Sequence, residues 1–153
     1  NFTSFPSVTK GSNNYSPYWL SGSAGVAGVL MRHIYVTKDN EHLDLTISTI
    51  NDSNRFYTLF PGLFNGLAGL GNLFLDAEQF LEDSKYKESA IKISNSLDMF
   101  SINKKEGVAF PGDYLNVINN DFGSGASGIA LFLNRLVNKN NNFNFYIDEI
   151  LFE

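Results

Sequence analysis

The chain of 153 residues carries 16 acidic and 11 basic side chains, a net charge of −5, and 43% of its residues are apolar. This apolar content is enough for the core of one globular domain, and because Lys and Arg are nowhere concentrated, we expect no nucleic-acid partner. No apolar run reaches the roughly 18 residues of a membrane span, so we expect no membrane partner either. The chain has no cysteine, which excludes disulfides, thiolate metal ligands and a cysteine nucleophile within it.

The beginning of the chain has no targeting pattern. Residues 1–10 are polar with scattered aromatics, and they contain neither an initiator Met nor a basic segment followed by an apolar one. We interpret the start as an internal point of a longer protein or as the beginning of an expressed piece.

A Gly-x-x-Gly pattern occurs three times, each time at the start of an apolar run, in residues 22–27, 66–71 and 125–130. Repetition at this spacing is typical of stacked helical pairs. The runs are apolar on nearly every side, which predicts buried inner helices at about 22–35, 66–76 and 125–136.

Two segments between the repeats are amphipathic instead. Apolar residues recur at helical spacing in 41–50 and in 85–100, which predicts two outer helices with Asn40 and Ser84 as their N-caps. A glycine within a helix costs on the order of 1 kcal/mol relative to alanine. We expect close approach of neighbouring inner helices to compensate, and chance in a glycine-rich chain is the alternative.

The segment 101–120 interrupts the helical pattern. Residues 108–110 and 114–118 alternate enough to predict two short strands around a Pro-Gly-Asp turn, a β insertion at about 106–119. After the third inner helix, residues 138–144 predict an Asn-rich loop, and 145–152 form a short apolar segment whose type the pattern leaves open.

The strings around the glycines resemble a known family. Tyr18-Trp19-Leu20-Ser21-Gly22, Leu63-Phe64-Asn65-Gly66 and Asp121-Phe122-Gly123-Ser124-Gly125 are similar to the last three hairpins of the lanthionine synthetase cyclase domain. The resemblance implies an all-α fold, a double-layered α/α toroid of seven hairpins, of which this chain would be the C-terminal portion with a small β insertion. It also implies a bacterial, cytoplasmic enzyme that adds a peptide cysteine thiol to a dehydrated serine or threonine.

In zinc-dependent members of that family, Cys, Cys and His stand at the positions of Leu20, Phe64 and Asn65. Leucine and phenylalanine cannot hold zinc, so we expect no metal there. This departure resembles the class III synthetases, which join lyase, kinase and zinc-free cyclase domains in one chain. The implied partners are a precursor peptide and the rest of the synthetase, while ATP or GTP and Mg would bind a separate kinase domain. Three hairpins of a ring also leave apolar edges, which the rest of the ring or a second copy of this chain would cover.

Titratable residues near the helix starts are the candidates for acid or base chemistry. Asp121, Asp113 and Tyr18 are predicted as catalytic, with Asp121 favoured, and a turn or N-cap role is the alternative for Asp121. Tyr114 is also titratable and close in sequence. The residues predicted to bind substrate, with packing as the alternative, are Trp19, Ser21, Phe64, Asn65, Phe122 and Ser124.

The remaining expectations concern the thiol and the two histidines. Without zinc, the positive ends of three inner helices would favour the thiolate. His33 lies about 16 Å beyond its helix start at 1.5 Å per residue, which predicts a structural histidine, and His42 is predicted to be solvated. Two other functions stay open: a non-catalytic peptide-binding or scaffold module, and a carbohydrate-active α/α toroid, which should carry paired carboxylates.

Overall fold

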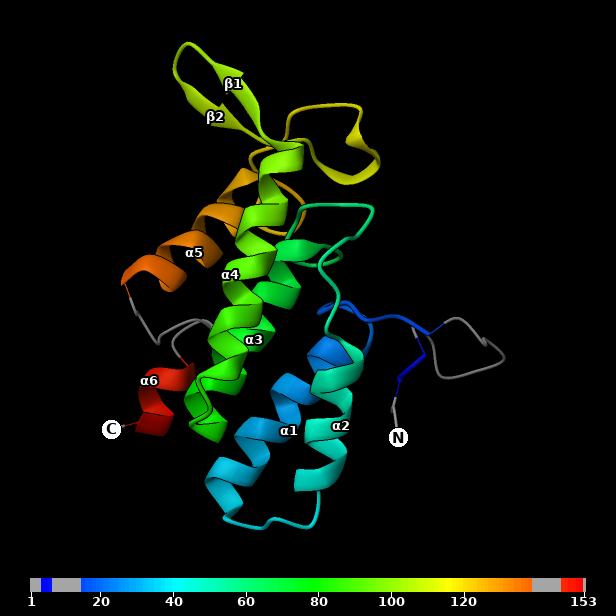
Figure 1. Ribbon diagram of the computed structural model, residues 1–153, viewed down its shortest axis with the longest axis vertical. Helices are drawn as coiled ribbons and strands as arrows, with labels where there is room; N and C mark the ends of the chain where they lie inside the picture. Colours follow the sequence, from blue (N-terminus) through cyan, green and yellow to red (C-terminus); the bar gives the residue numbers. More distant parts are fainter. Residues whose placement is uncertain (1–3, 7–14, 139–146, 153) are drawn as a thin grey trace.

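The computed structural model describes residues 4–6, 15–138 and 147–152 (Figure 1). It is mostly helical with one small antiparallel sheet, as predicted. Short 3₁₀ turns occupy Asp98–Phe100 and Asp113–Leu115. The main elements are α1 (Ser23–Thr37), α2 (Leu43–Asp52), α3 (Leu67–Leu81), α4 (Lys85–Leu97), β1 (Ile102–Lys104), β2 (Gly107–Ala109), α5 (Ala126–Asn138) and α6 (Ile147–Phe152).

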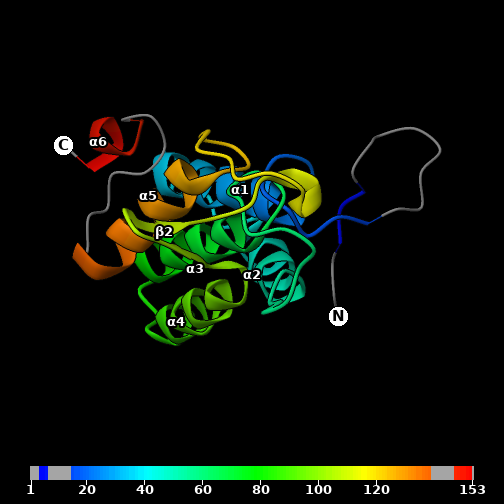
Figure 2. The same ribbon diagram turned by 90° about the horizontal axis from the view of Figure 1, so that it is seen from above.

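The helices lie in two layers. Helix α3 packs against α1, α5 and α4, and α2 packs against α1. Figure 2 shows α4 on the opposite side of α3 from α1 and α5. The inner layer therefore consists of the three helices that begin at a Gly-x-x-Gly pair, and the amphipathic helices α2 and α4 form the outer layer, as the sequence pattern predicts. None of the described helices has the length and apolar character that a membrane crossing requires.

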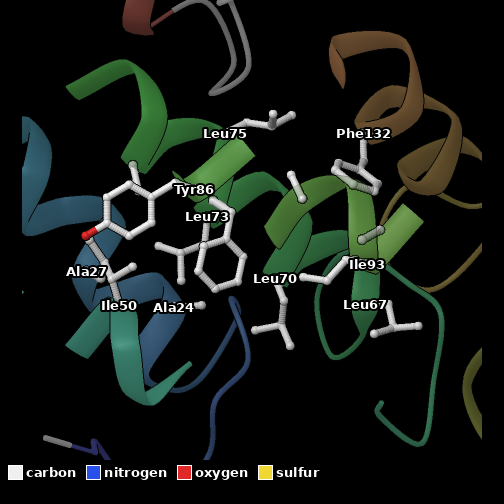
Figure 3. Packing of buried hydrophobic residues seen from close by; sticks show 14 of the residues in the cluster. Ala24, Ala27, Ile50, Leu67, Leu70, Leu73, Leu75, Tyr86, Ile93 and Phe132 are labelled. Atoms are coloured by element: carbon white, nitrogen blue, oxygen red, sulfur yellow. The ribbon is translucent and has the colours of Figure 1, made fainter. Parts of the chain in front are cut away.

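Helix α3 is the centre of the core. Every residue from Leu67 to Ala77 is buried, and Figure 3 shows Leu67, Leu70 and Leu73 of this helix in the core. The Phe74 ring stacks on Tyr86 of α4 at a centroid distance of 6.4 Å. Burying a side chain of this kind stabilises the fold by about 1.5–3 kcal/mol. Helices α1 and α5, predicted to be buried on nearly every side, are not: Val29 is 69% and Val137 76% exposed. Among the inner helices of the described residues, α1 and α5 each pack against α3 alone, so the other side of each is uncovered.

The helix ends differ from the predicted ones. Helix α3 runs to Leu81 rather than about 76, and it ends where Glu82 adopts a left-handed φ of 53°. Helix α2 begins at Leu43, so Asn40 is not its N-cap, although the Asn40 carbonyl accepts the Leu43 N–H at 3.0 Å. Ser84 is at the N-cap of α4 but makes no side-chain capping bond there. The Asp83 carboxylate accepts the Lys85 N–H at 3.0 Å instead.

The β insertion has a different register from the predicted one. Strands β1 and β2 pair Ile102 with Ala109, so the first predicted strand, 108–110, only overlaps β2. The second predicted strand, 114–118, is wrong, because Tyr114 and Leu115 adopt left-handed φ angles of 66° and 57° that no strand accommodates. Of the predicted tail, 139–146 lie outside the described residues, and the segment after them forms the short helix α6.

The Gly-x-x-Gly pairs make room for the loop before each helix rather than for a neighbouring helix. A β-carbon on Gly22 would lie 2.2 Å from the Ser16 carbonyl oxygen, and one on Gly25 would lie 2.2 Å from that of Trp19. The same two clashes recur at Gly66 and Gly69 and at Gly125 and Gly128. The geometry that recurs in the three repeats is therefore a loop that folds back over the first helical turn. At Gly69 and Gly128 a β-carbon would also lie 3.1 Å from Trp19 Cβ and 2.8 Å from Leu63 Cβ, so a neighbouring repeat does approach closely there, through its loop rather than its helix.

Candidate functional site

The three loops before the inner helices are joined to one another by backbone hydrogen bonds. The Leu20 N–H donates to the Phe64 carbonyl at 3.0 Å, and the Phe64 N–H donates to the Gly123 carbonyl at 2.8 Å. Leu20, Phe64 and Gly123 occupy equivalent positions, each two residues before the first glycine of its repeat. The same contact therefore sets successive repeats side by side and brings their loops together at one end of the helical layers.

A shallow depression lies where these loops meet, and we call it the rim depression. It has a volume of about 460 Å³. Six of the nine side chains predicted for the site line it, together with Leu20 and Gly123. These six are Phe64, Asn65, Asp113, Asp121, Phe122 and Ser124.

The other three predicted residues lie elsewhere. Trp19 and Ser21 line an apolar groove of about 670 Å³ along the uncovered side of α1. Tyr18 is among the lining residues of neither hollow, and its backbone N–H donates to Ser16 Oγ at 3.4 Å. Trp19 is still connected to the rim depression, because its ring stacks on Phe64 at 5.8 Å and Phe64 meets the edge of Phe122 at 5.9 Å. The three aromatic side chains therefore pack against one another in a row, and a substrate on them stays a prediction.

Asp121 is firmly held by its own turn. Its carboxylate accepts the Ser124 N–H at 2.6 Å, the Ser124 hydroxyl at 2.8 Å and the Asn119 side-chain amide. The Ser124 N–H, followed by these side-chain donors, lowers the pKa of Asp121 below the ordinary aspartate value. The carboxylate is thus ionised at neutral pH and serves as a turn acceptor, as in the alternative interpretation, while its catalytic role stays a prediction.

Asp113 differs from Asp121 in having an unpaired oxygen. Its Oδ1 atom is buried and has no hydrogen-bond partner among the described residues. Asp113 opens the 3₁₀ turn 113–115, and its side chain is partly buried at the wall of the rim depression. A buried acceptor without a partner costs about 1–3 kcal/mol, so such a group is typical of a site that holds a ligand or a proton.

The first N–H groups of the inner helices are already bonded. Ser23 N donates to Ser16 O at 2.8 Å, Leu67 N to Phe60 O at 3.1 Å, and Ala126 N to Asn119 O at 2.8 Å. These donors cannot directly bind a thiolate, contrary to the simplest form of the expectation. A contribution of the helix ends to the thiolate stays a prediction.

The residues at this site do not fit a zinc ion. Leu20, Phe64 and Asn65, the counterparts of the zinc ligands, all line the rim depression, but they bring no thiolate and no imidazole. Across the part of the chain that the structure describes, no three or more His, Cys, Asp or Glu side chains form a group able to hold a metal.

Both histidines lie away from the rim depression. His33 and His42 are exposed, with ring centroids 6.4 Å apart, between the last half of α1 and the start of α2. The solvated position of His42 is confirmed. His33 lies away from the rim depression, as its position in the helix predicts, and its structural role stays a prediction, since its side chain is exposed and its ring neighbour is His42.

Sequence reasoning missed a buried layer of charge at the opposite end of the inner helices. Arg32, Asp76 and Arg135, which we call the charge layer, each lie ten residues after the first glycine of their repeat, at 22, 66 and 125. Asp76 is 2% exposed, with Arg32 NH1 at 2.8 Å and Arg135 NH2 at 2.6 Å from its oxygens. The second contact lacks hydrogen-bond alignment and is an ion pair. Superposing the three repeats would have revealed these positions.

Helix α6 joins the same network. The Asp148 carboxylate, 0% exposed, accepts two bonds from Arg32, Nε to Oδ1 at 2.7 Å and NH2 to Oδ2 at 2.6 Å. Burial by itself would lower the pKa of Arg32, but the Asp148 and Asp76 carboxylates outweigh it and raise that pKa, so Arg32 stays charged. The far end of the inner layer therefore links α1, α3, α5 and α6 through buried charge pairs.

The chain matches a protein-family model along nearly its whole length. The model, described as lanthionine synthetase C-like protein, covers residues 1–149, which include all three inner helices and every residue of the rim depression. No curated protein matches the chain.

Proposed function

This chain belongs to the lanthionine synthetase C-like family, and we propose that it is the C-terminal part of a cyclase domain that closes thioether rings in a peptide. The substrate would be a precursor peptide in which serine or threonine has been dehydrated. Ring closure by the cysteine thiol would give lanthionine or the related labionin. The observation that carries the proposal is the convergence of the three repeat loops on the rim depression, with the unpaired carboxylate oxygen of Asp113 in its wall.

The reaction needs one proton to leave sulfur and one to reach carbon. The thiol sulfur bonds to the β-carbon of the dehydrated residue, and the electrons of the double bond move toward the carbonyl as an enolate. Asp113 would accept the thiol proton and return one to the α-carbon, so the addition is balanced without a further reactant. Phe64 and Phe122 would exclude water from the bound peptide, and geometry would supply much of the rate.

The proposal includes the wider protein. We propose a zinc-free cyclase of the class III type, in which further hairpins complete an α/α toroid and separate domains dehydrate the peptide with ATP or GTP and Mg. The uncovered faces of α1 and α5 support this, because Val29 and Val137 are exposed on the two outermost inner helices. The enzyme would act in the bacterial cytoplasm.

The test uses the full-length synthetase and a dehydrated precursor peptide. Ring closure leaves the peptide mass unchanged, so closure is followed as the loss of free thiol, by alkylation and mass spectrometry. Asp113→Asn should slow closure by about 10²-fold or more, the range for general acid–base catalysis, and should leave dehydration unchanged. Asp44→Asn, at an exposed acid of α2, is the matched control. Closure by Asp113→Asn at the wild-type rate would refute this role.

A peptide-binding scaffold is the second candidate function. Two observations favour it: within residues 4–6, 15–138 and 147–152 no metal-ligating set is found, and the Asp121 carboxylate is engaged in its turn. A wild-type protein that binds the dehydrated peptide but never accelerates loss of the thiol over the spontaneous reaction would select the scaffold over the enzyme.

A further inference from the structure

A closed loop projects beside the rim depression. We define it as residues 111–118. Its ends are joined by the bridge between Pro111 and Ile118, and the Gly112 N–H donates to the Val117 carbonyl at 2.9 Å. In Figure 1 it belongs to the yellow segment at the upper right, above the segment that leads into α3. The fastened base makes the loop a defined surface feature.

The loop presents apolar side chains to solvent at a cost in backbone energy. Tyr114 is 82%, Leu115 47% and Val117 62% exposed. Tyr114 and Leu115 follow each other in the left-handed region, with φ of 66° and 57°, which side chains with a β-carbon adopt at a cost. Packing does not repay this cost at Tyr114, whose ring meets Phe60 edge-on at 6.0 Å and otherwise faces outward. Strain of this kind is typical of segments that hold side chains ready for a ligand.

The closed loop is continuous with the proposed reaction site. Asp113, in the wall of the rim depression, directly precedes Tyr114. An extended peptide advances about 3.3 Å per residue, so a peptide with its cysteine in the rim depression would place the next one or two residues on the loop. Apart from Asp113 the loop carries no charge, although the whole chain has a net charge of −5. Its chemistry therefore fits uncharged apolar side chains.

We propose that the closed loop determines which peptide cysteines react, by binding apolar side chains that directly flank the cysteine through Tyr114 and Leu115. This inference rests on the proposed function, because it takes the rim depression as the place of the cysteine. The occupant is the substrate peptide itself. The loop is the specificity element, and Asp113 is the group that handles the proton.

The experiment compares two synthetic peptides on the full-length synthetase. Each contains one dehydroalanine and one cysteine, and the cysteine is flanked by Leu in the first peptide and by Ser in the second. Fluorescence anisotropy of labelled peptide gives Kd, and thiol alkylation gives the closure rate. The variants are Tyr114→Asn and Leu115→Asn, singly and together, because asparagine tolerates the left-handed conformation. Val108→Asn, at a side chain of β2 that is 58% exposed, is the matched control.

We expect the wild type to bind the Leu-flanked peptide about tenfold more tightly than the Ser-flanked one. The double variant should bring the ratio of the two Kd values close to one, because only the Leu-flanked peptide should bind more weakly. Val108→Asn should keep the wild-type ratio. If the double variant fails to fold, Tyr114→Asn alone decides the test. Because the Tyr114 side chain is 82% exposed, we expect this single variant to fold.

The outcomes separate the two proposals. Two results overturn the role of the closed loop and leave the cyclase function intact. In the first, the wild type closes rings but binds both peptides with the same Kd. In the second, the folded variants keep the wild-type ratio of the two Kd values. Tighter binding of the Leu-flanked peptide that depends on Tyr114, without any ring closure, overturns the cyclase function and leaves the closed loop only as a binding surface for apolar side chains. Failure of the wild type to bind either peptide overturns both.

Discussion

The charge layer allows a quantitative prediction about stability. Asp76 is the carboxylate shared by Arg32 and Arg135, which are 13% and 5% exposed at their side chains. Asp76→Asn keeps the size of the side chain and removes its charge. Arg32 would keep Asp148 as a partner, and Arg135 would keep its contacts with the neutral oxygens of Asn72 and Gln79 at 3.3 to 3.4 Å but lose the Asp76 carboxylate.

The cost in unfolding free energy comes from the buried Arg135 guanidinium, which loses the Asp76 carboxylate. Removing one partner of a buried ion pair costs about 3–5 kcal/mol. Because one of the two arginines keeps a carboxylate, and because asparagine can still accept a hydrogen bond, we expect about 3 kcal/mol. With an m-value of about 2 kcal/mol/M in urea, the unfolding midpoint should fall by about 1.5 M.

The assay is urea unfolding of the cyclase domain that contains this chain. Asp44→Asn is the control, since an exposed acid in the first turn of α2 contributes less than about 1 kcal/mol. Arg135→Met and the double variant complete a cycle, and removing both partners should cost clearly less than the sum of the single changes. Additive costs, or a midpoint for Asp76→Asn within error of the wild type, would refute the shared-carboxylate explanation.

Three further predictions test the loops and the site. Gly69→Ala should lower the unfolding free energy by about 1–3 kcal/mol, because the new β-carbon would lie 2.0 Å from the Leu63 carbonyl oxygen, whereas Gly28→Ala, with its nearest atom at 3.6 Å, should raise it by about 1 kcal/mol; equal urea midpoints would contradict this. Since folding lowers the pKa of Asp121, its stabilisation of the turn is present above the unfolded value of about 3.9 and is lost as pH falls through the lower folded value. The protection factor of the Ser124 amide, which is the exchange rate of the unfolded chain divided by that of the folded protein at the same pH, should therefore fall below about pH 4 in wild type but not in Asp121→Asn. Elemental analysis after dialysis should find no stoichiometric zinc, and about one zinc per chain would overturn the zinc-free proposal.

The helical layers could be predicted because their signals are local and repeated. Gly-x-x-Gly before an apolar run identified α1, α3 and α5, and spacing at 3.6 residues identified α2 and α4. The reason for the glycines could not be predicted, since the clash of Gly25 with the Trp19 carbonyl depends on how the preceding loop folds back. A sequence shows that a β-carbon is excluded and not which atom excludes it.

The insertion and the buried charges could not be predicted for different reasons. Residues 114–118 alternate like a strand, but Tyr114 and Leu115 adopt positive φ, and no residue type there signals it. Asp76 and Arg135 are of types that are usually exposed, so a reading of each helix by itself places them on a surface. Both become buried because hydrogen bonds between the loops set their repeats side by side. That contact depends on segments far apart in the sequence and not on the pattern within one helix.

The two ends of the inner helices are held together by different contacts, and α3 takes part in both. At its start, Phe64 joins the loops of its neighbours through Leu20 and Gly123, and at its far end Asp76 holds an arginine from each side. At the far end, the carboxylates of Asp76 and Asp148 are paired with the guanidinium groups of the two arginines. The unpaired Oδ1 of Asp113 lies at the near end, where the loops leave the rim depression open. Asp113 therefore keeps one acceptor oxygen available beside the rim depression, which is why we propose it for proton transfer, whereas the paired charges of the far end link α1, α3 and α5.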